Sequence, residues 1–187
     1  MNDTTRKLIG LAIASSLSAP VWALPAVQLT PSVTNVTTGQ TVTVSVDVTD
    51  LGGQIVSAYD LDVGFSAGLL SWTQTLFGGL LGDPSLFESL QDSSESSGVV
   101  DLAELSLLAD ADLDVLQPGD TVHLADLEFL ATADGQLSFG LIWGPGQDVK
   151  GFNNQVIIPT QVPLPGTLPL VALAGVAAWW GTRRKIV

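Results

Sequence analysis

The segment from residue 41 to residue 48 constrains the fold most, because its polar and apolar residues alternate without a break. Valine occupies every second position, and threonine, serine and aspartate lie between the valines. Successive side chains of a β-strand point to opposite faces of a sheet. The pattern therefore predicts a strand with one buried and one solvated face, which is typical of an antiparallel sheet.

Further segments show the same period of two. Apolar residues recur at alternate positions in the ranges 55–65 and 137–143, with Asp60 and Asp62 at intervening, outward positions. In the range 121–130 the phase slips, since Val122 and Leu124 are followed by Leu127 and Phe129. One extra residue near Ala125-Asp126 would restore the register, so we expect a β-bulge there. Turn signals rich in glycine separate these runs, and many short strands of this kind predict a β-sandwich.

Three segments between these strands are less regular. Asp83-Pro84 predicts a short helix, with aspartate as the N-cap and Leu86 and Leu90 on one face. The range 93–98, Ser-Ser-Glu-Ser-Ser-Gly, is expected to be a polar loop. The range 99–108 has strand character at its start and leucines at helical spacing, and we favour a strand over Val99 to Ser106.

The two ends of the chain have the composition of targeting segments. Arg6-Lys7, an apolar stretch and then Val21-Trp22-Ala23 predict a secretory signal peptide over 1–23, cut after Ala23. Near the other end, residues 164–180 carry no charge and would span about 26 Å as a helix, close to the thickness of a membrane core. The tryptophan pair Trp179-Trp180 ends this stretch and three basic residues follow, which predicts a transmembrane helix stopped by Arg183, Arg184 and Lys185.

This C-terminal region resembles the PEP-CTERM sorting signal in its variant with leucine at the third position. The resemblance is carried by Val162, Pro163, Leu164 and Pro165 together with the apolar segment and the bases. It implies that residues 160–187 are a sorting tail and that an exosortase, a membrane protease, processes them. The protein is thus expected to be exported to the periplasm, the cell surface or the extracellular matrix, at least transiently anchored in the inner membrane.

The segment between the two ends is strongly acidic. The chain has 19 acidic residues, and all except Asp3 lie in the range 24–161, where Lys150 is the one basic residue, so the net charge there is 1 − 18 = −17. Such a surface repels phosphate backbones, which excludes nucleic acid as a partner. It suits a divalent cation or a neutral polysaccharide, or it serves solubility alone. The chain has no cysteine, which excludes disulfides and thiolate chemistry.

The order of the strand patterns resembles the cohesin domain. The resemblance is carried by the ranges 38–46, Thr-Gly-Gln-Thr-Val-Thr-Val-Ser-Val, and 59–65, Tyr-Asp-Leu-Asp-Val-Gly-Phe, and by Pro118-Gly119-Asp120 with Leu127-Glu128-Phe129. It implies that residues 24–159 form an all-β jelly-roll sandwich of about nine strands. It also implies that one sheet face binds a partner, often a dockerin module.

Candidate binding residues fall into two groups. Large rings with polar edges can stack on sugars, which makes Trp72, Trp143 and Tyr59 candidates, although core packing explains Trp143 equally. Alternating aspartates in a loop can bind Ca²⁺, the one cofactor considered, and the candidates are Asp110, Asp112 and Asp114, for which a solvated acidic loop is the alternative. We expect no other cofactor.

Catalysis finds little support in the sequence. His123 is the single histidine, and no nucleophile motif accompanies it, so a Ser-His-Asp triad is not expected. We therefore expect no enzyme, but an exported surface or biofilm-matrix protein that binds a polysaccharide or an envelope protein such as a dockerin-like module. A secreted carbohydrate-active hydrolase and a purely structural matrix component are the alternatives.

Overall fold

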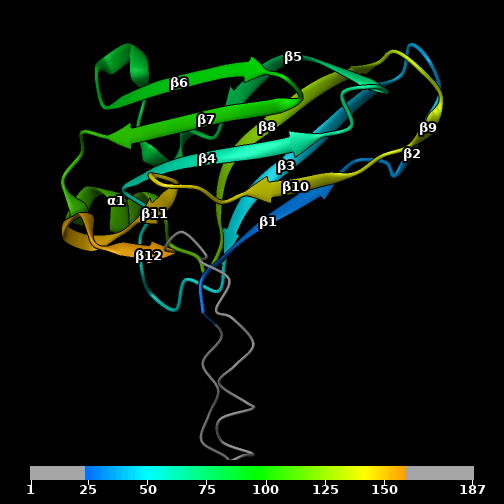
Figure 1. Ribbon diagram of the computed structural model, residues 1–187. Coiled ribbons are helices and arrows are strands. Elements are labelled where there is room, and N and C mark those ends of the chain that lie inside the picture. Colours follow the sequence, from blue (N-terminus) through cyan, green and yellow to red (C-terminus); the bar gives the residue numbers. More distant parts are fainter. Residues whose placement is uncertain (1–23, 159–187) are drawn as a thin grey trace, which may run out of the picture.

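The computed structural model describes residues 24–158, and these form a sandwich of two antiparallel β-sheets (Figure 1). The predicted signal peptide with Ala23, and the predicted sorting tail, transmembrane helix and terminal bases, lie outside the described residues. Within residues 24–158, no helix is long and apolar enough to cross a membrane. The all-β prediction is confirmed.

The first sheet has the order β1-β3-β8-β5. Its strands are β1 (Ala26–Pro31), β3 (Thr41–Thr49), β8 (Val122–Ala131) and β5 (Leu70–Phe77). As predicted, the valines of β3 are all fully buried while its polar residues face outward.

The predicted bulge lies in β8, one residue before its expected place. Val46 of β3 pairs with Ala125, and the next residue, Asp47, pairs with His123. Leu124 is therefore the extra residue, and both Leu124 and Ala125 are buried. The bulge lets apolar residues on both sides of the phase slip reach the core.

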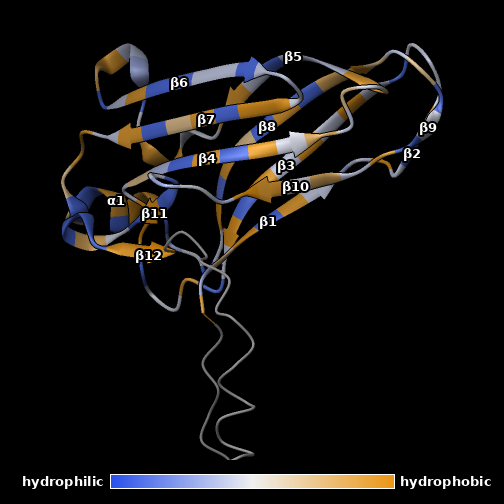
Figure 2. Cartoon of the chain, in the orientation of Figure 1, coloured by the Kyte–Doolittle hydropathy of each residue, from blue (hydrophilic) through white to orange (hydrophobic). Residues whose placement is uncertain are grey.

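The second sheet has the order β12-β11-β4-β7-β6, and β10 also pairs with β4. Its strands are β4 (Ala58–Phe65), β6 (Ser89–Ser96), β7 (Val99–Ser106), β10 (Phe139–Ile142), β11 (Asp148–Lys150) and β12 (Val156–Ile158). The strand predicted over Val99 to Ser106 is thus confirmed. Figure 2 shows the alternation of hydrophobic and hydrophilic residues along β4 and β7.

The polar loop expected over 93–98 is wrong for most of its length. Residues 93–96 belong to β6, which pairs with β7 along its whole length and forms an edge of the sheet. The turn is reduced to Ser97 and Gly98, which both have positive φ and so suit a two-residue hairpin connection. An edge strand does not need a continuous apolar face, so composition alone did not reveal it.

The connections contain short helices. Asp83 caps the turn η2 (Pro84–Leu86) by accepting a hydrogen bond from the Ser85 amide, as predicted, but the helix ends after three residues. Leu90 lies in β6, so the expected shared helical face with Leu86 does not form. The remaining elements are η1 (Gly79–Leu81), α1 (Asp110–Leu116), η3 (Phe152–Asn154), β2 (Asn35–Val36) and β9 (Gly135–Gln136).

The described residues contain twelve strands rather than about nine. The difference arises because the small β2–β9 sheet adds two strands of two residues each, and the lower edge of the second sheet is divided among β10, β11 and β12. The core lies between the two main sheets. Phe129 is fully buried at its centre, with ring centroids 4.9 Å from Phe65 and 5.5 Å from Phe139.

Candidate functional site

The pairing of the second sheet arranges its outward side chains in three rows across the strands, which we call the acidic face. The first row, which we call the apolar row, contains Leu90, Leu105 and Ala58 and ends at Lys150. The first acidic row contains Asp92, Ala103, Asp60 and Asp148. The second acidic row contains Ser94, Asp101, Asp62 and Ile142. Two residues separate the rows along each strand, so neighbouring rows lie about 7 Å apart.

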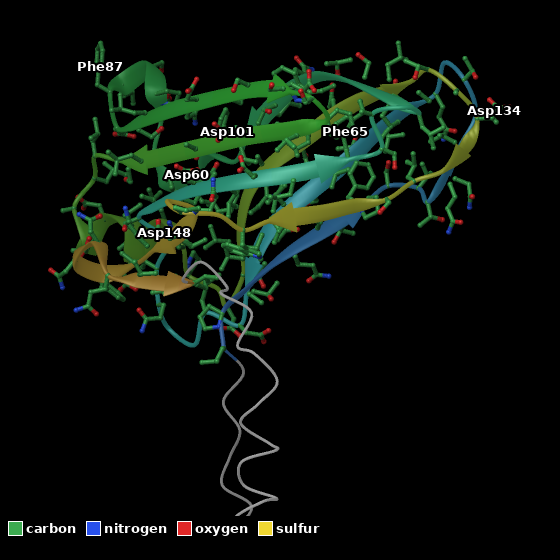
Figure 3. The ribbon with its side chains drawn as sticks, in the orientation of Figure 1. Asp60, Phe65, Phe87, Asp101, Asp134 and Asp148 are labelled. Atoms are coloured by element: carbon green, nitrogen blue, oxygen red, sulfur yellow. The ribbon has the colours of Figure 1, made fainter. Side chains whose placement is uncertain are left out.

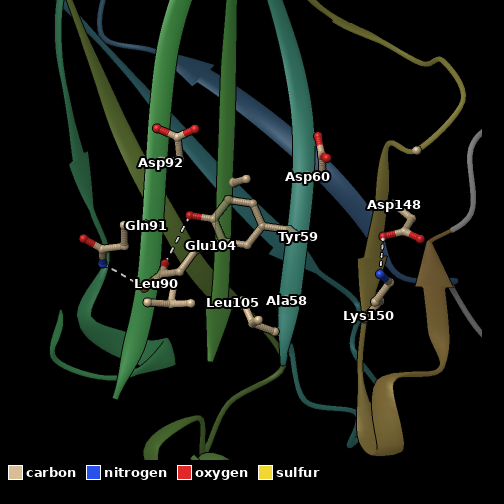
Figure 4. Close-up of a pocket in the computed structure, with 12 residues that line it drawn as sticks. Ala58, Tyr59, Asp60, Leu90, Gln91, Asp92, Glu104, Leu105, Asp148 and Lys150 are labelled. Atoms are coloured by element: carbon tan, nitrogen blue, oxygen red, sulfur yellow. Dashed lines mark hydrogen bonds and ion pairs between the residues drawn. The ribbon is translucent and has the colours of Figure 1, made fainter. Parts of the chain in front are cut away.

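A shallow pocket of about 370 Å³ lies between the apolar row and the first acidic row. Figure 4 shows Leu90, Leu105 and Ala58 on one side of it, with Asp60 and Asp92 on the other. Leu90 and Leu105 are 56% and 41% exposed although they are large aliphatic side chains. The pocket therefore combines apolar walls with carboxylates, which is the composition of a binding surface.

The carboxylates of the acidic face repel one another. Partial desolvation raises the pKa of Asp60, and the charges of Asp101, Asp62 and Asp148 raise it further, while Lys150 opposes them. The pKa of Asp62 is raised by desolvation and then by Asp101, which lies directly opposite in the register. Within the described residues, the side chains of Asp60, Asp92 and Asp101 accept no hydrogen bond.

The outer face of the first sheet, which we call the opposite face, provides hydrogen-bond partners for its acids. Asp47 accepts hydrogen bonds from Ser45 Oγ at 2.8 Å and is 2.9 Å from His123 Nδ1. Glu128 accepts a hydrogen bond from Gln74 at 2.7 Å. On the acidic face, Gln147 donates to Asp62 at 2.9 Å and Lys150 lies 3.7 Å from Asp148. The two faces therefore differ in that three carboxylates of the acidic face, those of Asp60, Asp92 and Asp101, accept no hydrogen bond within the described residues.

His123 does not form a catalytic triad. Its Nδ1 atom lies 3.2 Å from Ser45 Oγ and 2.9 Å from Asp47 Oδ1, so both groups contact the same ring nitrogen. A triad needs the serine on one ring nitrogen and the carboxylate on the other, because the first takes the proton while the second is oriented. This geometry orders the opposite face and does not activate the serine.

A buried polar network lies beneath the acidic face and includes Tyr59. The Tyr59 hydroxyl donates to Glu104 Oε2 at 3.2 Å and to the Leu124 carbonyl at 3.3 Å, which links the second sheet to the bulge of the first. Gln91 Nε2 donates to Glu104 Oε1 at 2.7 Å. Tyr59 and Glu104 are each 2% exposed, and burial raises both pKa values. Tyr59 as a sugar-stacking residue is therefore wrong, because its ring lies inside the sandwich.

The two candidate tryptophans are half-buried and pack against the core. Trp72 lies in β5 opposite Phe129, and its indole Nε1 atom is buried without a hydrogen-bond partner in the described part of the chain. Trp143 follows β10 on the other sheet. They come from different sheets, and their role in sugar binding stays a prediction.

The expected calcium loop is a helix. Asp110, Asp112 and Asp114 all lie in α1, where alternate residues point to different sides. Asp110 accepts a hydrogen bond from the Asn153 amide. Among residues 24–158, no three His, Asp or Glu side chains converge to hold a metal ion. Asp110 and Asp112 lie in the first turn of α1, where the helix dipole favours negative charge, and this placement corrects the expectation of a calcium loop.

Comparisons with known proteins bear on the fold. No protein-family model matches the chain, and no curated protein is significantly similar in sequence. A type II cohesin domain from the cellulosome of Acetivibrio cellulolyticus matches with a TM-score of 0.60 and 14% identity, over 76% of this chain and 93% of that one. The chain has a cohesin-like fold. Type II cohesin A11 of Bacteroides cellulosolvens matches with a TM-score of 0.56 and 16% identity, over 70% and 89% of the two chains.

One of the matching cohesin-like structures is a complex. It is a type II cohesin–X-dockerin complex from Acetivibrio cellulolyticus, with a TM-score of 0.58 and 13% identity, over 71% of this chain and 90% of that one. The sequence predicted the central strands of the cohesin-like sandwich but not the acidic face. The signal was present in Asp60 and Asp62, two outward positions on one strand, but locating their neighbours required the strand order.

Proposed function

We propose that this protein is an exported, non-catalytic binding module that docks a protein partner through its acidic face. The observation that carries the proposal is the composition of that face, where exposed leucines border uncompensated carboxylates around a shallow pocket. Such a surface is unfavourable for folding, since like charges directly opposite in a sheet destabilise it. A partner that covers the leucines and neutralises the acids would offset this cost.

A protein partner is supported better than a polysaccharide. Tyr59 is buried, and the two tryptophans pack against the core on different sheets, so these three candidate rings form no shared exposed platform for a sugar. The Acetivibrio cellulolyticus cohesin-like relative in a complex with a dockerin agrees with a protein partner. The predicted signal peptide and sorting tail would bring the module to the cell envelope or its matrix, where it would meet that partner.

The test uses the full chain in neutral detergent and a bulky substitution on each face. Partners are isolated from the envelope fraction, identified by mass spectrometry, purified and titrated calorimetrically. Ala103→Trp places an indole between Asp92 and Asp60, and we expect it to weaken binding at least about tenfold by steric exclusion. Ser71→Trp, on the exposed opposite face, is the control and should bind as the wild type does. Equal binding by the Ala103→Trp variant would exclude the acidic face as the docking site.

Localisation needs a separate test. The mass of the mature protein recovered from cells shows where it is cut: a product that begins at Leu24 and ends near Pro163 supports export and sorting. A polypeptide that keeps both ends and stays in the cytosol contradicts them.

A further inference from the structure

A small apolar projection, Leu86 with Phe87, stands at one end of the acidic face. Leu86 is 65% exposed and Phe87 is 82% exposed, the latter one of the two most exposed large hydrophobic residues described. Figure 3 shows Phe87 beyond the edge of β6. Exposing two adjacent large apolar side chains on a soluble domain is unfavourable, which makes their presentation worth explaining.

The projection is held in place by its own loop. The carboxylate of Asp83 accepts from the Ser85 amide at 2.8 Å, and the Asp83 carbonyl accepts from the Glu88 amide at 3.1 Å. In return the Asp83 amide donates to Glu88 Oε2 at 3.1 Å. Phe87 itself has φ +59°, a left-handed conformation that costs free energy for a bulky residue. The loop therefore fixes the aromatic ring outward rather than letting it fold onto the sandwich.

The loop that carries the projection is bound to the end of the strands that carry the apolar row. The Leu107 amide donates to the Glu88 carbonyl at 2.7 Å, which ties the end of the loop to the strand that carries Leu105. Leu107 is 53% exposed, and Leu90 follows Phe87 by three residues at the start of β6. Exposed apolar side chains thus lie both on the loop and at the adjoining end of the sheet, where the apolar row borders Asp60 and Asp92.

Charge decides which occupant fits this surface. A second copy would bring its own acidic rows against these, and an anionic lipid surface would be repelled in the same way. A partner of opposite charge gains from both parts of the surface, because its apolar side chains cover the leucines and its cations face the acids. In protein interfaces, buried aromatic anchors commonly supply much of the binding energy, and charged pairs beside them supply specificity.

We propose that Leu86 and Phe87 anchor the partner of the acidic face, and that this partner is a protein segment with apolar side chains next to lysine or arginine. The proposal rests on the proposed function and specifies the chemistry of the partner. It also fixes the orientation of the partner: the apolar end of the partner lies over Phe87, and its basic end lies over Asp60, Asp62 and Asp101.

The probe is a pair of fluorescent 18-residue amphipathic helical peptides with leucine on one side and either lysine or glutamate on the other. Binding to the full chain in neutral detergent is followed by anisotropy at low salt. We expect the lysine peptide to bind and the glutamate peptide not to bind. The variant Leu86→Ala with Phe87→Ala should weaken binding of the lysine peptide at least about fivefold, whereas Leu130→Ala, an exposed leucine of the opposite face, should leave it unchanged.

A matched charge control separates this site from general attraction to an acidic protein. The triple variant Asp60→Asn, Asp62→Asn and Asp101→Asn removes three charges from the acidic face. A second triple variant, Asp47→Asn, Asp126→Asn and Glu128→Gln, removes three charges from the opposite face. We expect at least about a tenfold loss for the first and less than a twofold loss for the second. Equal losses, or an unchanged affinity when Leu86 and Phe87 are removed, would overturn the proposal.

The outcomes also separate this inference from the proposed function. If the isolated envelope partner loses affinity for the Ala103→Trp variant but binds the Leu86 and Phe87 variant normally, the acidic face docks a partner and the anchor is wrong. If the lysine peptide shows the expected selectivity but Ala103→Trp leaves the envelope partner bound, the chemistry of the surface is right and its proposed use is wrong.

Discussion

The Glu104→Gln variant should be at least as stable as the wild type at neutral pH, although Glu104 is a buried residue with several hydrogen bonds. Its carboxylate accepts from Gln91 Nε2 at 2.7 Å and from the Tyr59 hydroxyl at 3.2 Å. A glutamine at this position keeps both contacts: its oxygen accepts from Gln91, and its amide donates to the tyrosine oxygen. The Tyr59 hydroxyl still donates to the Leu124 carbonyl. The substitution therefore removes a desolvated charge and keeps these two contacts, and the Ser89 hydroxyl beside Glu104 can either donate to the glutamine or accept from it.

Glu104→Ala provides the contrast. It leaves the half-buried Gln91 amide without its acceptor, and an unsatisfied buried donor costs about 1–3 kcal/mol. The alanine variant should thus be less stable than the glutamine variant by about 1–3 kcal/mol, even though both lack the charge. Urea denaturation followed by tryptophan fluorescence measures the free energy of unfolding of both. A glutamine variant as unstable at pH 8 as the alanine variant would refute the reasoning, since the charge itself would then be required.

The pH dependence of stability provides a second test of the role of Glu104. Burial raises the pKa of Glu104 above its ordinary value near 4.5, so the native state binds its proton more tightly than the unfolded state does. The contribution of Glu104 to stability is therefore most favourable below its unfolded pKa, and it is lost as the pH rises through the raised native pKa. In the glutamine variant this decline is absent, so the wild type should lose stability relative to it as the pH rises above about 4.5.

Three further predictions concern the core, the acidic face and one close approach. Phe129→Ala should lower the free energy of unfolding by about 3–5 kcal/mol, because the ring is fully buried between two others; a loss below about 1 kcal/mol in urea denaturation would contradict this. Asp101→Asn should raise it by about 0.2–1 kcal/mol at low salt by relieving repulsion with the directly opposite Asp62, and the gain should vanish in thermal unfolding at 1 M salt. Gly78→Ala should cost about 1–3 kcal/mol, since its Cβ would collide with the His123 carbonyl, whereas Gly79→Ala, with open space around it, should show a much smaller change in melting temperature.

The sandwich could be predicted because the central strands have apolar residues on the core side and polar residues on the solvent side, which alternate in the sequence. β3 and β4 each have one face in the core and one in solvent, so alternation alone identified them and their inward residues. The bulge could also be predicted, since a change in the phase of the apolar alternation without a turn signal requires an extra residue. β6 was missed for the opposite reason: its inward residues include Gln91, whose amide is satisfied by Glu104 rather than by burial of apolar surface.

The helix α1 shows a limit of motif reading. Alternating aspartates are compatible with a loop that binds a cation or with the negative first turn of a helix, and the two differ only in backbone conformation. Leu113, fully buried, anchors α1 to the sandwich. Burial of Leu113 therefore favours the helix, and the spacing of the aspartates alone does not indicate that burial.

The contrast between the two outer faces cannot arise from composition, because both lie on the same acidic chain. On the opposite face, Asp47 and Glu128 are matched with a histidine, a serine and a glutamine, so their lone pairs are used within the sheet. On the acidic face, Asp101 and Asp62 are aligned across two strands where an alternation of polar and charged residues would have served folding better. Folding alone does not favour that alignment. A surface whose charges are unfavourable for the free domain, and which borders the leucines of the apolar row, is best explained by a cationic partner that makes the same charges favourable on binding.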